Sequence, residues 1–341
     1  MTHDLGEILR NFKVVGELVD ASPYGFGHIN DTYAAWLQRA DGTRHRILLQ
    51  RVNDRVFHNP HKLMENIARV TAHLRSRILE CGGDPLRETL TLIPTVDDRV
   101  FFQDAEGSTW RAYVFIEGAR TYEAVASLDQ VYHGARAFGR FQNLLSDLPA
   151  AELHKTIPDF HNTPKRFDAF MRAVEQDVCN RAAGVRSEIG FILQRAAEAP
   201  VLLDLSAGGA LPLRVTHNDT KFNNVMIDDR TGEGVCVIDL DTVMPGLALY
   251  DVGDCARSAT NTVAEDEPDP SRVRFDLAVF EHLVAGYLDA ARDFLTQQEI
   301  DHIPFAARLM TLECGMRFLA DYLAGDVYFK IHRPAHNLDR C

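Results

Sequence analysis

The sequence predicts an α+β protein of two lobes, a small strand-rich lobe followed by a larger helical lobe. Short apolar runs separated by turn residues fill most of the first part of the chain, with one helical segment among them. Later apolar residues recur mainly at helical spacing, apart from one hairpin pattern. A length of 341 residues also exceeds the usual size of one domain. We therefore expect an N-terminal lobe at 1–116 and a C-terminal lobe at 117–341, with a ligand cleft between them.

In the first lobe the strand patterns come in two groups around a helix. The apolar runs 14–19, 32–37 and 44–52 predict three strands, and the runs 88–96, 99–103 and 109–117 predict two or three more. Between the third and fourth run, Leu63, Ile67, Val70 and Leu74 recur at helical spacing, so residues 59–78 are expected to form a helix.

The second lobe begins with a helix and contains one hairpin. Residues 127–145 have a helical pattern, with Ser127 as a suitable N-cap. Two short apolar runs, 225–227 and 235–238, flank the turn sequence DDRTGEG and predict a β-hairpin. Residues 206–214 and the acidic, proline-containing stretch 262–272 read as loops.

Composition narrows the class of protein. The chain is 46% hydrophobic and 25% charged, an ordinary globular balance. A net charge of -13 disfavours nucleic acid and membrane surfaces as partners, because both select for basic proteins. None of the six cysteines forms a CxxC pair, and no apolar stretch resembles a signal or a membrane span. We expect a cytoplasmic protein with reduced thiols.

The stretch THNDTKFNNVMI (216–227) gathers polar residues directly before the hairpin. Asn224 lies just before the first strand and Asp239 just after the second. Antiparallel partners lie about 4.5–5.5 Å apart, so the hairpin brings both to one end. Asp219 is in the loop that feeds this end, and Asp241 is nearby. A hairpin with polar ends would explain each residue singly, but the spacing as a set favours a site.

The chemistry of phosphoryl transfer suits this set of residues. Mg²⁺ prefers oxygen ligands, commonly one or two carboxylates plus the phosphates of a substrate. A further carboxylate can accept the proton of a hydroxyl group that attacks the phosphoryl group. Protein kinases place an Asp, then an Asn five positions later, then a hairpin and a metal-binding Asp. Asp219, Asn224 and Asp239 follow the same spacing.

The motifs HNDTKFNNVMIDD and VIDLD resemble the signature of the aminoglycoside phosphotransferase and choline kinase superfamily. The resemblance implies a bilobal protein-kinase-like fold and transfer of phosphate from ATP, with Mg²⁺, to a hydroxyl of a small molecule. It also implies Asp219 as catalytic base and Asn224 and Asp239 as metal ligands. Lys221, between them, could touch the γ-phosphate, whereas His217 is better explained as a brace for the loop.

The N-terminal lobe carries weaker signals for the nucleotide. Gly25 and Gly27 lie between two strands, which fits a loop that covers phosphates but also fits a simple turn. Where protein kinases have a lysine on the third strand, this chain offers Gln50 and Arg51. Only one of the two can face the cleft. We favour Arg51 for its charge, with Glu65 of the following helix as its partner, although Glu65 also suits a solvated face.

Two further sets of residues complete the expected site. Residues 115–118, with Phe115 and Glu117, lie at the lobe junction, where the backbone would meet adenine. Near the C-terminus, Arg317 and Asp321 share a helix face, which a surface ion pair would equally explain. Tyr328 follows, and it could equally be a packed tyrosine.

The stretches YGFGHINDTY, LLQRVN, DVGDCARSATN and RFLADYLAGDVYFKIHRPAHNLDR are together similar to the N-acetylhexosamine 1-kinases of this superfamily. This similarity implies phosphorylation of the anomeric hydroxyl of GlcNAc or GalNAc, with sugar contacts from Asp219, Asp239, Arg317 and Tyr328. Two alternatives stay open. One is a kinase of another small hydroxyl compound, such as an amino alcohol, an aminoglycoside or homoserine. The other is a non-catalytic nucleotide- or sugar-binding protein.

Overall fold

The computed structural model describes residues 3–25, 29–122, 125 and 127–341. Its N-terminal part is built on an antiparallel sheet in the order β1-β2-β3-β6-β4, with β5 also paired to β6. These strands are β1 Glu17–Pro23, β2 Asp31–Gln38, β3 Arg44–Arg51, β4 Leu92–Ile93, β5 Phe102–Gln103 and β6 Thr109–Val114. The helices of this part are α1 Leu5–Leu9, α2 Pro60–Glu80 and α3 Pro85–Glu88.

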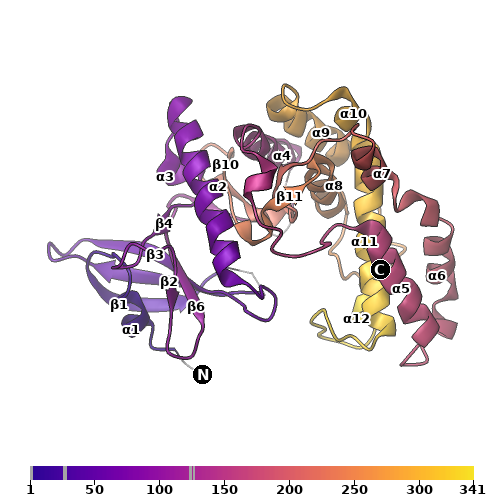
Figure 1. The fold of residues 1–341 in the computed structure, drawn as a ribbon, viewed down its shortest axis with the longest axis horizontal. Coiled ribbons are helices and arrows are strands. Elements are labelled where there is room, and N and C mark those ends of the chain that lie inside the picture. Colours follow the sequence, from indigo (N-terminus) through magenta and orange to yellow (C-terminus); the bar gives the residue numbers. More distant parts are fainter. Residues whose placement is uncertain (1–2, 26–28, 123–124, 126) are drawn as a thin grey trace.

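The two faces of the sheet bury different residues, because side chains alternate along a strand. Leu37, Ile47, Leu49 and Trp110 pack with α1 in one small core. Tyr113 belongs to the main core on the opposite face, together with α2. In Figure 1, α2 lies between the sheet and the C-terminal part of the molecule. The sheet therefore presents one face toward the region where the two parts meet.

Helix α2 forms as its sequence predicts. Asn59 caps its N-terminus by accepting a hydrogen bond from the backbone N–H of Lys62, and Pro60 occupies the first turn. The four apolar residues expected to face the core are all buried: Leu63, Ile67, Val70 and Leu74.

The C-terminal part is mainly helical (Figure 1). Its helices are α4 Leu128–Leu144, α5 Thr163–Gln176, α6 Arg186–Leu193, α7 Val201–Ala207, α8 Ala248–Ala259, α9 Leu277–Ala291, α10 Gln297–Asp301, α11 Ile303–Leu323 and α12 His336–Arg340. Two glycines let α4 and α9 approach closely. A Cβ atom on Gly286 would lie 2.1 Å from the carbonyl oxygen of Tyr132, and one on Gly139 would lie 2.5 Å from that of Tyr287.

Two small sheets within this part position the loop that carries the polar motif. The predicted hairpin forms from β9 Val225–Asp228 and β10 Gly234–Val237, and β7 Ala119–Arg120 joins it on the β9 side. A second sheet pairs β8 Arg214–Thr216 with β11 Met244–Gly246. The motif runs from β8 into β9, so both of its ends are anchored in sheets.

The structure confirms the α+β class, with an antiparallel sheet in the N-terminal part and helices in the C-terminal part. Several boundaries differ from the sequence-based expectation. The first strand begins at Glu17 rather than residue 14, because Gly16 has φ +110°, outside the strand region. The runs 88–96 and 99–103 contain only the two-residue strands β4 and β5.

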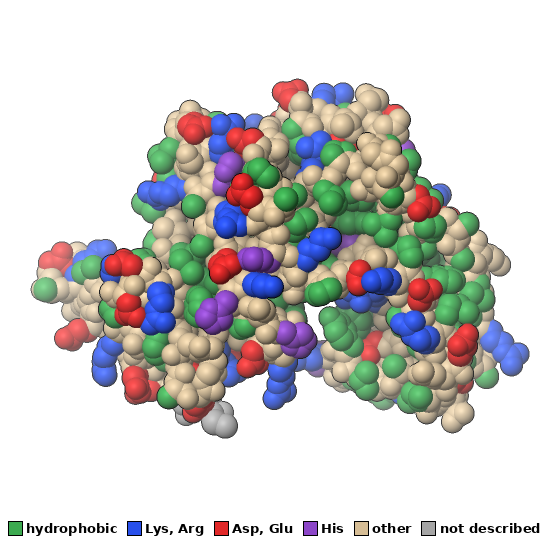
Figure 2. All heavy atoms as spheres, viewed as in Figure 1, with side chains coloured by type: hydrophobic (Ala, Val, Ile, Leu, Met, Phe, Trp, Pro, Cys, Tyr) green, Lys and Arg blue, Asp and Glu red, His purple; other side chains and the backbone are tan. Residues whose placement is uncertain are grey.

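Over the part of the chain that the structure describes, no helix has the length and apolarity to cross a bilayer. All six cysteines are free thiols. Figure 2 shows acidic and basic side chains interspersed on the face in view.

Candidate active site

The loop between β8 and β9 holds its backbone in an unusual conformation directly before Asp219. Asn218 has φ +66°, in the left-handed region that asparagine tolerates better than most residues. Its side-chain amide donates to the carbonyl of Thr242 (2.9 Å), and its side-chain oxygen accepts from the hydroxyl of Thr216 (3.0 Å). The conformation that presents Asp219 is therefore fixed by side-chain hydrogen bonds.

A buried carboxylate on α8 holds the backbone of the same loop. Asp251 accepts hydrogen bonds from the backbone N–H of His217 (2.9 Å) and of Asn218 (2.7 Å). Gln142 of α4 donates a third hydrogen bond to it. Burial raises the pKa of Asp251, while these three hydrogen-bond donors act to lower it.

Both ring nitrogens of His217 contact backbone groups. Its Nε2 lies 2.8 Å from the carbonyl oxygen of Ile238, and its Nδ1 accepts from the N–H of Asp219 at 3.2 Å. The carbonyl can only accept, so Nε2 carries the proton and Nδ1 does not. The ring is thus a neutral connector between the loop and the hairpin.

Asp219, Lys221, Asn224 and Asp239 line one cavity. The Asn224 amide donates to the carbonyl oxygen of Asp219 (2.8 Å), and Lys221 Nζ lies 3.2 Å from Asp219 Oδ1. Burial acts to raise the pKa of Asp219, but the positive charge of Lys221 acts against it and the pKa is lowered. Asp219 in turn raises the pKa of Lys221. The structure thus brings these predicted residues together.

Asp239 follows β10 in the left-handed conformation, with φ +59°. Burial, Asp241 and Asp219 raise its pKa to about 7. Such a surplus of negative charge is what a divalent cation would neutralise. No group of three or more His, Cys, Asp or Glu side chains placed to hold a metal occurs in the described ranges. Asn224 and Asp239 would therefore hold Mg²⁺ only with oxygens from phosphates or water, as Mg²⁺ commonly accepts.

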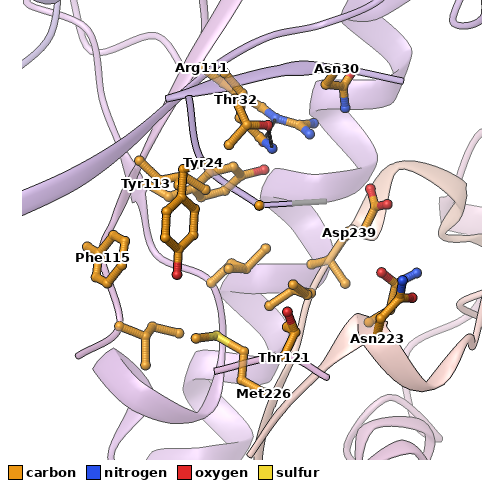
Figure 3. Close-up of a pocket in the computed structure, with 18 of the residues that line it drawn as sticks. Tyr24, Asn30, Thr32, Arg111, Tyr113, Phe115, Thr121, Asn223, Met226 and Asp239 are labelled. Carbon is orange, nitrogen blue, oxygen red and sulfur yellow. Dashed lines mark hydrogen bonds between the residues drawn. The ribbon is translucent and has the colours of Figure 1, made fainter. Parts of the chain in front are cut away.

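The cavity has a volume of about 300 Å³ and lies where the sheet meets the hairpin. Figure 3 shows aromatic residues Tyr24, Tyr113 and Phe115 on one side and Asp239 and Asn223 on the other. Its apolar lining also includes Leu48, Leu90, Ile116, Met226 and Ile238. An apolar end opposite a polar end suits a nucleotide, whose base is flat and whose phosphates are charged.

The glycine-containing turn contributes to this cavity. Gly25 lines it with φ +83°, and a Cβ there would meet no atom within 4 Å, so the backbone conformation rather than space requires glycine. Gly27 falls outside the described residues. Ile29 and Asn30, just beyond, also line the cavity.

The expected ion pair between Arg51 and Glu65 is wrong. Gln50 lines the cavity, so alternation points Arg51 away from it. Arg51 instead pairs at 2.6 Å with Asp31, its direct neighbour across β2 and β3. Glu65 contacts His154 at 2.6 Å. Neither residue is among those that line the cavity.

Sequence reasoning missed a cation of the N-terminal part that lines the cavity, Arg111 of β6. It lies opposite Gln50 in the register and donates to the Gln50 side chain (3.0 Å). It also forms a buried ion pair with Asp241, which accepts a further hydrogen bond from Asn30 (2.6 Å). Burial acts to lower the pKa of Arg111, but Asp241 outweighs it and the pKa is raised. The signal was a lone arginine within the apolar strand TWRAYV.

Of the two residues expected at the lobe junction, Phe115 lines the cavity and Glu117 does not. The Arg46 guanidinium lies 3.8 Å from the centre of the Phe115 ring. The Glu117 side chain turns outward to pair with Arg46, and its carbonyl accepts from Arg87 (2.6 Å).

Arg317 and Tyr328 lie in a different hollow, of about 340 Å³, beside α5 and α11. The Arg317 guanidinium lies over the rings of Phe160 and Phe329. Asp321 does not pair with it, because it accepts from the backbone N–H groups of residues 327–329. Tyr328 is 68% exposed, so it is not a packed core tyrosine.

Fold and site together define a class. A β-rich part and a helical part enclose a cavity with a phosphoryl-transfer set of Asp, Asn and Asp, which is the arrangement of a small-molecule phosphotransferase. The chain matches the model of the phosphotransferase enzyme family (APH) over residues 20–294. It belongs to that family.

Solved structures support the same fold. One is an aminoglycoside phosphotransferase from Alicyclobacillus acidocaldarius subsp. acidocaldarius, with TM-score 0.64, 11% identity, and coverage of 98% of this chain and 89% of that chain. A spectinomycin phosphotransferase in complex with ADP and spectinomycin has TM-score 0.61 and 13% identity, covering 98% and 92%. A microcompartment-associated aminopropanol kinase has TM-score 0.58 and 16% identity, covering 98% and 92%. At these identities the similarity establishes the fold.

Proposed function

We propose that this phosphotransferase uses ATP and Mg²⁺ to phosphorylate a sugar hydroxyl, the anomeric hydroxyl of an N-acetylhexosamine. The observation that carries the proposal is the position of Asp219 in one cavity with Asn224 and Asp239. The spectinomycin phosphotransferase of the same fold was solved with ADP, which supports an adenine nucleotide.

In the proposed reaction Asp219 accepts the proton of the acceptor hydroxyl. The hydroxyl oxygen then bonds to the γ-phosphorus, and the bond to the leaving ADP oxygen breaks. The lowered pKa of Asp219 keeps the carboxylate ionised and ready to accept. Mg²⁺ held by Asn224 and Asp239 would supply charge neutralisation on the phosphates. Lys221, 3.2 Å from Asp219, would add a positive charge beside the transferred group.

Arg111 takes the place of the missing third-strand lysine in this proposal. It is a cation in the cavity lining, and its neighbour Gln50 occupies the third-strand position. Arg111 would compensate the negative charge of Asp241 in their buried pair, which lowers the total negative charge that the phosphates would meet. Phe115 and the backbone at the junction would contact the base, and Gly25 would approach the phosphates.

The charge of the hollow that contains Arg317 and Tyr328 indicates which kind of acceptor could bind there. Among its described lining residues are the three arginines Arg166, Arg172 and Arg317, and Asp321 is the one acid. That acid is already occupied by backbone N–H groups. A cationic amino alcohol or aminoglycoside would be repelled there, whereas hydroxyl and acetamide oxygens can accept from arginine. The hollow is linked to the catalytic loop, because Arg317 lies over Phe160, next to His161, which contacts Asn218.

A panel of acceptors coupled to ADP release tests the proposal. GlcNAc and GalNAc should be phosphorylated, whereas ethanolamine, aminopropanol, homoserine and aminoglycosides should not. A 1-O-methyl glycoside should be inactive, because its anomeric oxygen carries no proton. If an amine were phosphorylated and the sugars were not, the acceptor would be an amine rather than a sugar. Nucleotide binding without any phosphorylated product would favour a non-catalytic binding protein.

A further inference from the structure

One buried histidine joins the catalytic loop to the helical part, and the proposed reaction does not use it. His161 lies just before α5, and its side chain is 6% exposed. Its Nε2 lies 2.9 Å from the carbonyl oxygen of Asn218, and its Nδ1 lies 2.8 Å from Oε1 of Glu313 on α11. The other Glu313 oxygen accepts from the hydroxyl of Thr163.

Both ring nitrogens of His161 face oxygen atoms, and this limits its protonation. The Asn218 carbonyl can only accept, so Nε2 must carry a proton. An ionised Glu313 can also only accept, so Nδ1 must carry one too. A neutral ring would therefore place a lone pair against one of the two oxygens, unless Glu313 were itself protonated. Thr163 donates to Glu313, which favours the ionised carboxylate.

We propose that His161 is a buried imidazolium that positions Asp219 by holding the carbonyl of Asn218. The contact acts on the peptide group that joins Asn218 to Asp219. Asp251 holds the N–H of Asn218 from α8 at 2.7 Å, so the two sides of this left-handed residue are held by two separate segments, α8 and the turn before α5. His161 is a positioning residue and touches neither substrate nor nucleotide.

The groups around His161 support the charged form. Glu313 faces it from α11, and Asp254 and Tyr250 face it from α8. Burial acts to lower the pKa of His161, but Glu313, the Asn218 carbonyl and Asp254 outweigh it and the pKa is raised. Burial likewise acts to raise the pKa of Glu313, but His161, Thr163 and Arg317 outweigh it and the pKa is lowered. Burial raises the pKa of Tyr250, which therefore stays protonated.

Loss of the charge has a defined consequence. A hydrogen bond to a carboxylate is stronger than one to a neutral carbonyl, so the ring keeps its Nδ1 proton and releases the Nε2 proton. The Asn218 contact is then lost and the loop loosens. Because the pKa is raised, turnover is expected to fall as pH rises above the ordinary histidine range and through the pKa of the folded protein.

The variant Glu313→Gln removes the charge of the carboxylate but keeps the shape of the side chain. A glutamine amide can donate to Nδ1 while its oxygen accepts from Thr163, so a neutral ring keeps its Nε2 proton on the Asn218 carbonyl. This variant should hold its kcat to alkaline pH, where the wild-type kcat falls. His161→Ala should lower kcat on the order of 10–100-fold with little change in KM, since the base is misplaced. His73→Gln is the matched control, because His73 is a half-buried histidine of α2 that also contacts a carboxylate, that of Asp147.

Nitrogen NMR of the histidine rings and of the Asp219 amide decides the proposal without an activity assay, so its failure is distinct from failure of the proposed function. Both His161 ring nitrogens should be protonated in most molecules at pH 6.5, the ordinary pKa of histidine. The Asp219 amide shift should titrate together with His161 in the wild type and stay constant in Glu313→Gln. A ring with either nitrogen unprotonated in most molecules at pH 6.5, or an Asp219 amide shift that does not follow the titration of His161, would overturn the proposal.

Discussion

Arg111 on β6 and Asp241, two residues after the proposed metal ligand Asp239, form an ion pair that is almost entirely buried between the two parts of the molecule. Their side chains are 2% and 3% exposed. Asn30, from the segment after the glycine turn, donates to the other oxygen of Asp241. One carboxylate of the C-terminal part thus receives two groups from the N-terminal part, and the cavity is held together at its polar end.

Removing Arg111 should destabilise the protein strongly. Arg111→Met leaves Asp241 buried without its cation, which typically costs about 3–5 kcal/mol. Arg51→Met removes the cation of an exposed pair with Asp31 and should cost at most about 1 kcal/mol. Urea unfolding of both variants measures the difference. Equal losses would contradict the distinction between the two pairs, and a double variant Arg111→Met with Asp241→Leu should recover part of the loss.

Asp219→Asn should lower kcat by about 10²–10⁴-fold, because the amide cannot accept the proton of the acceptor hydroxyl. Nucleotide affinity, measured by calorimetry, should change little. Asp229→Asn provides the control, since Asp229 lies on the hairpin turn and pairs with exposed Arg120. Unchanged turnover in Asp219→Asn would remove this residue from the catalytic role.

The sequence predicted the central part of the site because local geometry determines it. A hairpin brings its two ends together, so the spacing of Asn224 and Asp239 placed them in one cavity. Arg111 could not be found this way, since its position beside Gln50 depends on a strand register that pairs distant segments. His161 was missed for the same reason, because Asn218, the loop residue it contacts, is 57 positions further along the sequence. The Arg51–Glu65 pairing failed because side-chain alternation left open which of Gln50 and Arg51 faces the cleft, and charge favoured the wrong one.

Close packing of α4 against α9 predicts a steric effect at Gly286. A Cβ there would lie 2.1 Å from the carbonyl oxygen of Tyr132, so the backbone itself must move. Gly286→Ala should destabilise the fold by about 1–3 kcal/mol. Gly190→Ala, in α6 with no atom within 4 Å of its Cβ, should instead stabilise it by about 0.5–1 kcal/mol. Thermal unfolding measures both, and a shift of the same sign would contradict the packing argument.

Arg317→Ala should weaken binding of the acceptor substrate without affecting binding of the nucleotide. A hydrogen bond to a charged group contributes about 1.5–3 kcal/mol, which corresponds to roughly 10–100-fold in the KM of the acceptor. Arg308→Ala is the control, because Arg308 lies on the same helix but pairs with Glu198 away from this hollow. Steady-state kinetics with each substrate varied would show the split. A rise in the KM for ATP alone would move Arg317 out of the acceptor site.

The His161–Glu313 pair predicts how stability depends on pH. Its carboxyl has a pKa below the ordinary 4.5, so its contribution is present above that pH and is lost as pH falls through the folded value. Its imidazole has a pKa above the ordinary 6.5, so its contribution is complete below that pH and is lost as pH rises through the folded value. The pair therefore stabilises the fold most between about 4.5 and 6.5.

Glu313→Gln should flatten this part of the stability curve. Without the carboxylate, His161 has no ionic partner, and its pKa should fall because burial disfavours the charged ring. The free energy of unfolding, measured in urea from pH 4 to pH 9, should show the largest difference between wild type and variant near pH 5.5 and a smaller one at pH 9. His73→Gln should run parallel to the wild type at alkaline pH. A difference between wild type and Glu313→Gln that is constant over the range would mean that the two side chains are not an ion pair, because only a charge lost on titration makes the difference depend on pH.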